Sequence, residues 1–249
     1  MTTDRERILR EMGLGPIWKL RAASPALPVK AVAPPVSPAP VQARMVPSAS
    51  AAPVVTAAAP QSAMNWDELE TAVAACRQCR LCEARKQAVL GVGDRAADWL
   101  FVGEGPGAEE DQRGEPFVGQ AGKLLDSMLA AIGLKRGQDV YIANAVKCRP
   151  PENRTPAPEE TAACRPYLQR QIELLEPKLI VALGRPAAQT LLQAEVKIAA
   201  ARGKLHDYHG IPLIVTYHPA YLLRTLLDKA KAWEDLCFMR RTMAVRNGG

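Results

Sequence analysis

The feature that most constrains this fold is the alternation of short apolar runs with helical segments after residue 64. The apolar runs are DWLFVG (98–103), DVYIAN (139–144), KLIVALG (178–184) and IPLIVTYH (211–218), and helical patterns cover 65–89, 119–134, 157–177, 185–193 and 228–245. Strands that alternate with helices are typical of α/β domains with a mainly parallel sheet. We therefore predict a central four-stranded, mainly parallel sheet flanked by helices.

Unusual residues follow three of these predicted strands. The first runs into GEGPG, the second into NAVKCRPP and the fourth into YHPAYLLR. In parallel sheets the reactive groups lie beyond the carboxyl ends of the strands, where neighbouring loops meet. The pattern therefore predicts a functional site at one edge of the sheet.

The first 63 residues have a different composition. Residues 23–63 contain 9 Pro and 13 Ala among 41 positions, which is typical of an extended, disordered linker rather than a packed core. Before it, Ile8, Leu9 and Met12 share one helical face. We interpret residues 1–22 as a short amphipathic docking segment for a protein partner, with folding back onto its own domain as the alternative, residues 23–63 as the linker, and residues 64–249 as the folded domain that carries any functional site.

Composition excludes some classes of protein. No run of about 18 apolar residues is present, which argues against a membrane span. The charged start, MTTDRERILREMGLG, does not resemble a secretory signal, so we expect a cytoplasmic protein. In that reducing compartment, six cysteines indicate ligands, catalysts or buried fillers rather than disulfides. Of the net charge of +6, residues 1–63 carry +4, so any nucleic-acid contact by the main body depends on local clusters.

The loop after the first strand, GEGPGAEEDQRGEPFVGQAG (103–122), is rich in glycine but does not fit a dinucleotide-binding motif. Its glycines at 103, 105 and 107 have the wrong spacing, and Pro106 removes a backbone donor. The acidic run 109–111 would repel phosphate, whereas Phe117 offers a flat apolar face to a small uncharged ring. The alternative is a surface turn with Phe117 in the core.

The loop after the second strand combines an amide with basic residues. Asn144 offers a donor and an acceptor, which together can read a carbonyl and an adjacent N–H. Lys147, Arg149 and Arg154 lie in a proline-stiffened stretch suited to phosphate contacts. The alternative is an ordinary solvated loop.

The loop after the fourth strand offers a histidine and an apolar wedge. His218 can donate to developing negative charge, and Pro219 is suited to open a helix. Tyr221, Leu222 and Leu223, beside Arg224, are suited to wedging into a base stack. The alternatives are a structural histidine and side chains that pack beneath the last helix.

Four cysteines without histidines would suit either an iron–sulfur cluster or zinc. Cys148 and Cys164, with fifteen residues between them, complete such a set with either Cys76 and Cys79 or Cys79 and Cys82. Spacing alone does not choose between the metals or the pairs, and unrelated buried cysteines are the third alternative.

Taken together, GEGPGAEEDQRGEPFVGQAGKLLD, NAVKCRPPENRTP, YHPAYLLR and the order of the cysteines resemble the iron–sulfur-containing family 4 uracil-DNA glycosylases of bacteria and archaea. The resemblance spans roughly residues 66 to 245. It implies a three-layer fold of the uracil-DNA-glycosylase type and a [4Fe–4S] cluster. The RLCEAR stretch after Cys79 implies Cys76, Cys79, Cys148 and Cys164 as ligands and leaves Cys82 spare.

The resemblance also implies roles for single residues. Phe117 would stack on a flipped uracil, Asn144 would hydrogen-bond its edge, and His218 would donate to its carbonyl oxygen as the glycosidic bond breaks. Glu104 and Gly105 would line the pocket, and Glu110 would lie near C5 and help to exclude thymine. The implied catalytic set is thus His218, Glu104 and Glu110, and the implied substrate-binding set is Gly105, Phe117 and Asn144.

We therefore expect a monomeric, monofunctional hydrolase that releases uracil from single- and double-stranded DNA in base excision repair. Contacts to DNA are expected from Lys147, Arg149, Arg154, Tyr221, Leu222 and Arg224. The alternatives are a non-catalytic iron–sulfur or zinc DNA-binding module, and an unrelated nucleotide-binding α/β enzyme.

Overall fold

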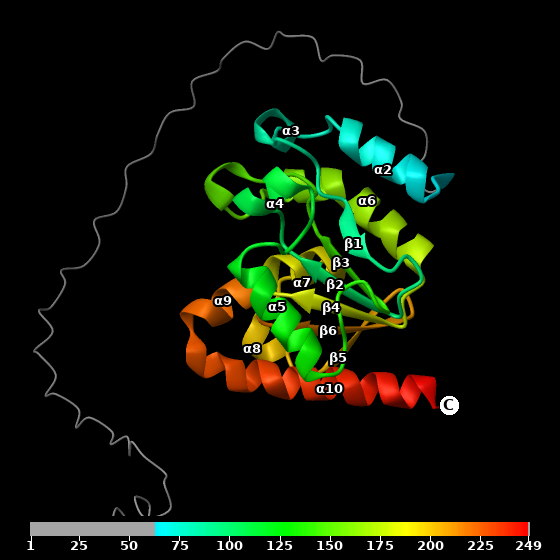
Figure 1. Cartoon of the computed structure of the whole chain (residues 1–249), viewed down its shortest axis with the longest axis vertical. Coiled ribbons are helices and arrows are strands. Elements are labelled where there is room, and N and C mark those ends of the chain that lie inside the picture. Colours follow the sequence, from blue (N-terminus) through cyan, green and yellow to red (C-terminus); the bar gives the residue numbers. More distant parts are fainter. Residues whose placement is uncertain (1–62, 249) are drawn as a thin grey trace, which may run out of the picture. The chain divides into compact units, whose positions relative to one another are not determined.

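A computed structural model describes residues 63–248 (Figure 1). The expected docking segment 1–22 and all but the last residue of the expected linker lie outside the described residues. Within them, no helix is long and apolar enough to cross a membrane.

The sheet has six strands in the order β1-β3-β2-β4-β6-β5. They are β1 (Gly91–Gly93), β2 (Trp99–Gly103), β3 (Val140–Asn144), β4 (Leu179–Leu183), β5 (Leu205–Tyr208) and β6 (Ile211–Thr216). The four predicted strands are β2, β3, β4 and β6, and they pair in parallel as expected. The predicted count of four is too low, because β1 and β5 add an antiparallel strand at each edge.

The two edge strands lack the sequence pattern of the central ones. β1 is only Gly-Val-Gly, and β5 alternates exposed with half-buried residues. β5 joins β6 through His209 and Gly210, which both have positive φ, as the tight turn of a two-residue hairpin requires. Short edge strands of this kind leave no long apolar run to detect.

Helices cover both faces of the sheet, as the three-layer prediction requires (Figure 1). Their bounds are α2 (Trp66–Ala75), α3 (Leu81–Ala84), α4 (Ala108–Arg113), α5 (Gln120–Ala131), α6 (Pro158–Leu175), α7 (Arg185–Leu192), α8 (Ile198–Ala201), α9 (Pro219–Arg224) and α10 (Lys229–Asn247), with short 3₁₀ turns η2 (Pro151–Asn153) and η3 (Leu226–Asp228). The helices α5, α9 and α10 pack on one face, and α6, α7 and α8 on the other.

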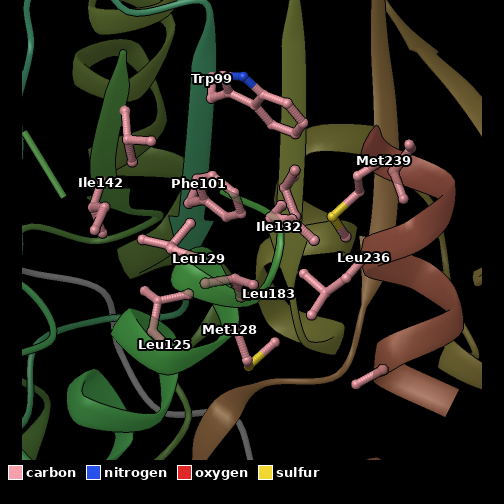
Figure 2. Packing of buried hydrophobic residues seen from close by; sticks show 14 of the residues in the cluster. Trp99, Phe101, Leu125, Met128, Leu129, Ile132, Ile142, Leu183, Leu236 and Met239 are labelled. Carbon is pink, nitrogen blue, oxygen red and sulfur yellow. The ribbon is translucent and has the colours of Figure 1, made fainter. Parts of the chain in front are cut away.

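Alternation along the buried strands supplies both layers. In β2, Phe101 faces the α5–α10 layer, whereas Leu100 and Val102 face the α6–α7 layer. Figure 2 shows Phe101 beside Leu129 of α5, in the layer that also contains the α10 side chains Leu236 and Met239. Because these strands are apolar on both faces, they are fixed in the middle of the domain, and their carboxyl ends form a rigid edge.

The long helix predicted over 65–89 is wrong. Asn65 caps α2 as expected, but α2 ends at Ala75 and the chain turns before the short α3. Arg85 satisfies the helix end: its Nη2 donates to the carbonyls of Ala74 at 2.7 Å and Cys76 at 3.0 Å. The break at Cys76 brings the cysteine-bearing turn toward Cys148 and Cys164, which the helical period alone could not indicate.

Candidate active site

A cavity of about 850 Å³ opens where the parallel strands end, as the strand-end pattern predicted. This volume is within the usual range for small-ligand sites, about 300–1,000 Å³. Its walls come from the loops after β2, β3, β4 and β6. The lining residues include Glu104, Gly105, Gly107, Glu110, Phe117, Ala121, Asn144, Arg154, Thr155, Gly184, Arg185, Tyr217, His218, Tyr221 and Arg224.

Asn144, the last residue of β3, lies at the base of this cavity. The residue is 2% exposed, and its Oδ1 makes no hydrogen bond within residues 63–248. An added Cβ on Gly103 of the neighbouring strand would lie 2.4 Å from this oxygen and 2.5 Å from Phe117 Cζ. Glycine at 103 therefore lets the amide and the aromatic ring meet. An unpaired buried acceptor is costly, so this oxygen is set up to receive a donor from a ligand.

Phe117 is held against this amide in a conformation that is unusual for a non-glycine residue. Its φ is 56°, in the left-handed region. Arg136 supports it by donating from Nη1 and Nη2 to the carbonyls of Pro116 and Phe117, both at 2.9 Å. Gly122 allows the close approach, since a Cβ there would lie 1.8 Å from the Phe117 carbonyl oxygen. The ring position is thus fixed before any ligand arrives.

His218 follows β6 and caps α9, which opens at Pro219 as predicted. Its Nδ1 accepts from the Ala220 N–H at 3.1 Å, so the neutral ring carries its proton on Nε2. Burial lowers the pKa of His218 to about 4; the charge of Arg224 acts in the same direction and Glu110 opposes it. The imidazole stacks on Phe117, with ring centroids 5.5 Å apart. It is a neutral N–H donor at neutral pH.

Glu104 and Arg185 lie on the same cavity wall. Burial raises the pKa of the Glu104 carboxyl, against a hydrogen bond with Thr155 and the positive charge of Arg185. Arg185 opens α7 just after Gly184, whose φ of +87° and 2.9 Å approach to His218 Cβ exclude a side chain. Sequence reasoning missed Arg185, although it follows a predicted strand just as the other site residues do.

Glu110, on α4, organises the loop that carries Phe117. One carboxylate oxygen accepts from Gly107 N at 3.1 Å, and the other accepts from Val118 N at 3.0 Å and Gly119 N at 3.2 Å. The helix itself was not predicted. Its carboxylate lines the cavity while it fixes the two ends of the loop around the aromatic ring.

The comparisons with known proteins agree with this geometry. The sequence profile described as the Uracil DNA glycosylase superfamily matches residues 90–237, more than half of the chain. The chain belongs to the uracil DNA glycosylase superfamily. The matched range contains all four strand-end loops of the cavity.

Within the superfamily, proteins named as type-4 enzymes are the more similar. The chain is 50% identical to the type-4 uracil-DNA glycosylase of Thermotoga maritima over 151 residues, 60% of this chain and 78% of that protein. It is 44% identical to the type-4 enzyme of Pyrobaculum aerophilum over 184 residues, 70% and 92% of the two chains. A type-5 uracil-DNA glycosylase of Thermus thermophilus is 37% identical over 149 residues, covering 52% and 68%.

The four cysteines expected to be ligands line a second cavity, between α2, α6 and the loop after β3. Cys76, Cys79, Cys148 and Cys164 all face it, together with apolar Val73 and Tyr167. Arg85 Nη1 donates to Cys148 Sγ at 2.8 Å, and the Lys147 N–H donates to Cys164 Sγ at 3.2 Å. Cys82 instead lines a separate polar cleft with Arg77 and Arg113.

Of these four thiols, Cys148 and Cys164 are buried, and Cys76 and Cys79 are half-buried. Burial raises the pKa of the Cys79 and Cys148 thiols, and that of Cys164 to about 12. Among the described residues, no three His, Cys, Asp or Glu side chains converge closely enough to hold a single metal ion. Four thiols around one cavity, with N–H donors directed at two of the sulfurs, are a donor set that both zinc sites and iron–sulfur clusters use.

Two of the expected DNA contacts are wrong. Lys147 is 1% exposed and lies inside the domain, where its Nζ donates to the Asn144 carbonyl at 2.8 Å. Leu222 is 1% exposed and packs in the core with α5 and α10. For Lys147 the charged residue type, and for Leu222 the exposed neighbour Leu223, concealed an inward-facing side chain. The exposed apolar residues of this region are Leu223, Leu226 and Leu227.

The other expected DNA contacts are accessible in part. Arg224 and Tyr221 line the cavity mouth, and the Tyr221 hydroxyl donates to Asp228 at 2.6 Å. Arg154 also lines it, but its guanidinium donates to both oxygens of Glu160 at 2.8 and 2.7 Å. Arg149 donates to Asn153 Oδ1 at 2.8 Å and is not part of the cavity lining. The Arg154 guanidinium is thus already paired with Glu160 within the protein.

Proposed function

We propose that this chain is a uracil-DNA glycosylase that hydrolyses the N-glycosidic bond in base excision repair. One observation carries the proposal: a buried unpaired amide oxygen, an aromatic face and a neutral imidazole donor meet in one cavity at the sheet edge. The type-4 names of the relatives favour the same activity.

Asn144 would read the base. Uracil presents an N–H beside a carbonyl, so Oδ1 accepts from the first and Nδ2 donates to the second. Cytosine presents the opposite pattern on that edge. It would leave the buried amide unpaired, at a cost of about 1–3 kcal/mol. The free Oδ1 in the unliganded protein is the acceptor that this recognition needs.

His218 would assist bond cleavage. As the glycosidic bond breaks, negative charge develops on the uracil ring, and a preorganised donor lowers the barrier. The Nε2 proton is the one available, because Nδ1 accepts from Ala220. Phe117 would stack on the ring, and Glu110 would hold the Phe117 loop in a position that excludes the thymine methyl group. Glu104 and Gly105 would complete the wall.

The substrate must reach this cavity as an extruded nucleotide, because a stacked base cannot enter it. Arg224, Arg185 and Tyr221 at the mouth would contact the DNA on either side of it. The proposal is tested with single- and double-stranded oligonucleotides that contain one uracil. Free uracil should appear while the strand stays intact until alkali cleaves the abasic site. No release from either substrate would overturn the activity.

We further propose a [4Fe–4S] cluster held by Cys76, Cys79, Cys148 and Cys164. The enclosed four-thiol set and the N–H donors directed at Cys148 and Cys164 support it. When bound, the cluster would join α2, the loop after β3 and α6 covalently. Its ligands line a cavity separate from the uracil cavity, so the cluster would take no direct part in breaking the glycosidic bond.

Colour and metal content test the ligand set. Wild-type protein should be brown and contain about four irons per chain. Cys76→Ser should lose the colour, whereas Cys82→Ser is the matched control and should keep it. Stoichiometric zinc in a colourless protein would contradict the cluster and favour the zinc alternative.

A non-catalytic DNA-binding module is the second candidate that the sequence suggested. Such a module has no need for an amide, an aromatic ring and an imidazole in one pocket, and the oligonucleotide test separates the two. A partner for residues 1–22, a monomeric state and a cytoplasmic location stay predictions.

A further inference from the structure

Lys147 is the most unusual buried residue outside the uracil cavity. It stands three residues after Asn144 and directly before Cys148. Its Nζ donates to the backbone carbonyl of Asn144 at 2.8 Å and to Oε1 of Gln171. The side chain therefore caps the end of β3 from inside the domain, although sequence reasoning placed it on the DNA.

Gln171 presents its oxygen to this lysine because its nitrogen is used elsewhere. The side chain is fully buried on α6, and its Nε2 donates to the Leu90 carbonyl at 3.0 Å and the Tyr141 hydroxyl at 3.3 Å. With both amide ends engaged, Gln171 has one orientation available. It fixes the lysine ammonium in one place.

The backbone of Lys147 completes a link to the cysteine site. Its N–H donates to Cys164 Sγ at 3.2 Å, and its carbonyl accepts from Val89 N at 2.8 Å. Lys147 thus contacts Asn144, the residue proposed to read the base, through its side chain, and Cys164, a proposed cluster ligand, through its main chain. Few residues could connect the two sites more directly.

No carboxylate balances this buried cation. Within residues 63–248 Lys147 makes no ion pair with a carboxylate, and its hydrogen bonds go to the Asn144 carbonyl, the Gln171 side chain and the sulfur of Cys164. A fully buried lysine without a counter-ion is rare, since the desolvation cost is not repaid. The hydrogen bonds to the Asn144 carbonyl and to Gln171 are therefore what hold the Lys147 side chain in this position.

We propose that Lys147 is a positioning residue that couples the four-cysteine site to uracil recognition. By holding the Asn144 carbonyl with its side chain, Lys147 sets the direction of the Asn144 side chain, and its backbone N–H binds the Cys164 sulfur at the same time. Loading of the cysteine site therefore controls the accuracy of base reading. This inference rests on the proposed function and on the proposed cluster.

The first test uses Lys147→Met, which keeps the volume but removes the charge and the donor. Two affinities are measured: inhibition by free uracil, which reports the Asn144 edge, and binding of DNA that already carries an abasic site. We expect the inhibition constant for uracil to rise about tenfold, equivalent to one lost hydrogen bond. Abasic-site DNA should bind as before. Lys178→Met, at an exposed lysine paired with Asp98, is the control and should change neither.

Gln171 variants keep the proposal testable if Lys147→Met folds poorly. Gln171→Leu removes the acceptor and should weaken uracil inhibition in the same selective way. Gln171→Glu restores an acceptor for the ammonium and should return uracil inhibition toward the wild-type value. Equal weakening toward uracil and abasic DNA would mean a general structural role and overturn the inference, as would unchanged uracil inhibition in both Lys147→Met and Gln171→Leu.

The link to the cysteine site has its own measurement. Removing a nearby positive charge disfavours reduction, so Lys147→Met should shift the cluster reduction potential to more negative values, while Lys178→Met should not. Wild-type protein stripped of iron should show weaker inhibition by uracil in a competition assay. An unchanged potential, or uracil inhibition that is independent of iron content, would contradict the coupling. Loss of uracil release by the wild-type protein would instead contradict the proposed function.

Discussion

The base of the uracil cavity and its rim differ in how they are organised. At the base, Asn144 and Phe117 are buried and His218 is half-buried, and backbone donors, Arg136 and close-packed glycines fix their positions. Just beyond Arg224, the last residue of the chain that lines the cavity, the 3₁₀ turn η3 presents Leu226 and Leu227, which are 64% and 90% exposed, and we call this turn the rim.

This contrast separates two tasks. A rigid base can discriminate uracil from cytosine because its donors and acceptors need no reorganisation when the ligand enters. Exposed leucines have nothing to pack against until DNA arrives, and apolar side chains inserted between base pairs help to hold a distorted duplex. We therefore expect changes at the base to affect every substrate, and changes at the rim to affect duplex DNA selectively.

The largest effect is expected for His218→Ala. It removes the Nε2–H donor at the position where charge develops, and loss of one such donor costs about 10²–10³ in kcat. The rate of uracil release should fall by that factor on single- and double-stranded DNA alike. Single-turnover kinetics give the rate, and visible absorbance shows whether the cysteine site is intact. A variant as fast as wild type would remove His218 from the mechanism.

A single methyl group tests the packing of the base. In Gly103→Ala the new Cβ would meet both Asn144 Oδ1 and the Phe117 ring at about 2.5 Å, so both must shift. We expect roughly a hundredfold loss in kcat, as for a reacting group displaced by about 1 Å. Thermal denaturation should show a loss of about 1–3 kcal/mol in unfolding free energy.

Gly203→Ala is the matched control for that variant. Gly203 has a φ of +69° and no neighbour within 4 Å of an added Cβ, so the substitution strains the backbone without crowding a site. It should lower stability by about 1–2 kcal/mol and leave uracil release unchanged. If the two variants lost activity equally, the close packing of Asn144 and Phe117 would not be the cause.

The same contrast explains how far sequence reasoning reached. The position of the residues at the base of the cavity could be predicted because they follow strands. The strands of the parallel core are visible in the sequence as apolar runs followed by unusual residues. Asn144 and His218 were found in this way. Arg185 was available to the same rule at the end of β4, but a lone arginine before a proline gave no chemical signal.

Side-chain direction was the part that the sequence concealed. Lys147 and Leu222 both face inward, although Arg149 and Leu223 nearby are at least partly exposed. Their directions depend on partners distant in sequence, Gln171 on α6 for the lysine and the α5–α10 layer for the leucine. The turn between α2 and α3 was missed for a similar reason, since Arg85 stabilises the helix end only in the folded domain.

The rim is tested by Leu227→Ala. We expect this exposed side chain to occupy the gap that the flipped nucleotide leaves in the duplex. Its removal should cost about 1 kcal/mol of apolar contact, so uracil release from duplex DNA should slow by roughly threefold to tenfold. Single-stranded DNA has no gap to fill and should react at the wild-type rate. Leu205→Ala, at an exposed leucine on β5, is the control. Equal slowing on both substrates would assign Leu227 to the base rather than the rim.

The smallest expected effect is that of pH on the base of the cavity. Burial holds the pKa of His218 at about 4, well below its ordinary value of 6.5, with a further lowering from Arg224. The neutral donor therefore persists from pH 8 down to about 5, and the single-turnover rate should show no inflection near 6.5. Stability behaves differently. Below about pH 6.5, His218 is protonated in the unfolded chain but stays unprotonated in the folded protein. The unfolding free energy should therefore decrease as pH falls toward 4. NMR titration of the imidazole in the folded protein measures the pKa on which both expectations depend. A midpoint near 6.5 would show that the cavity does not hold His218 neutral and would contradict both.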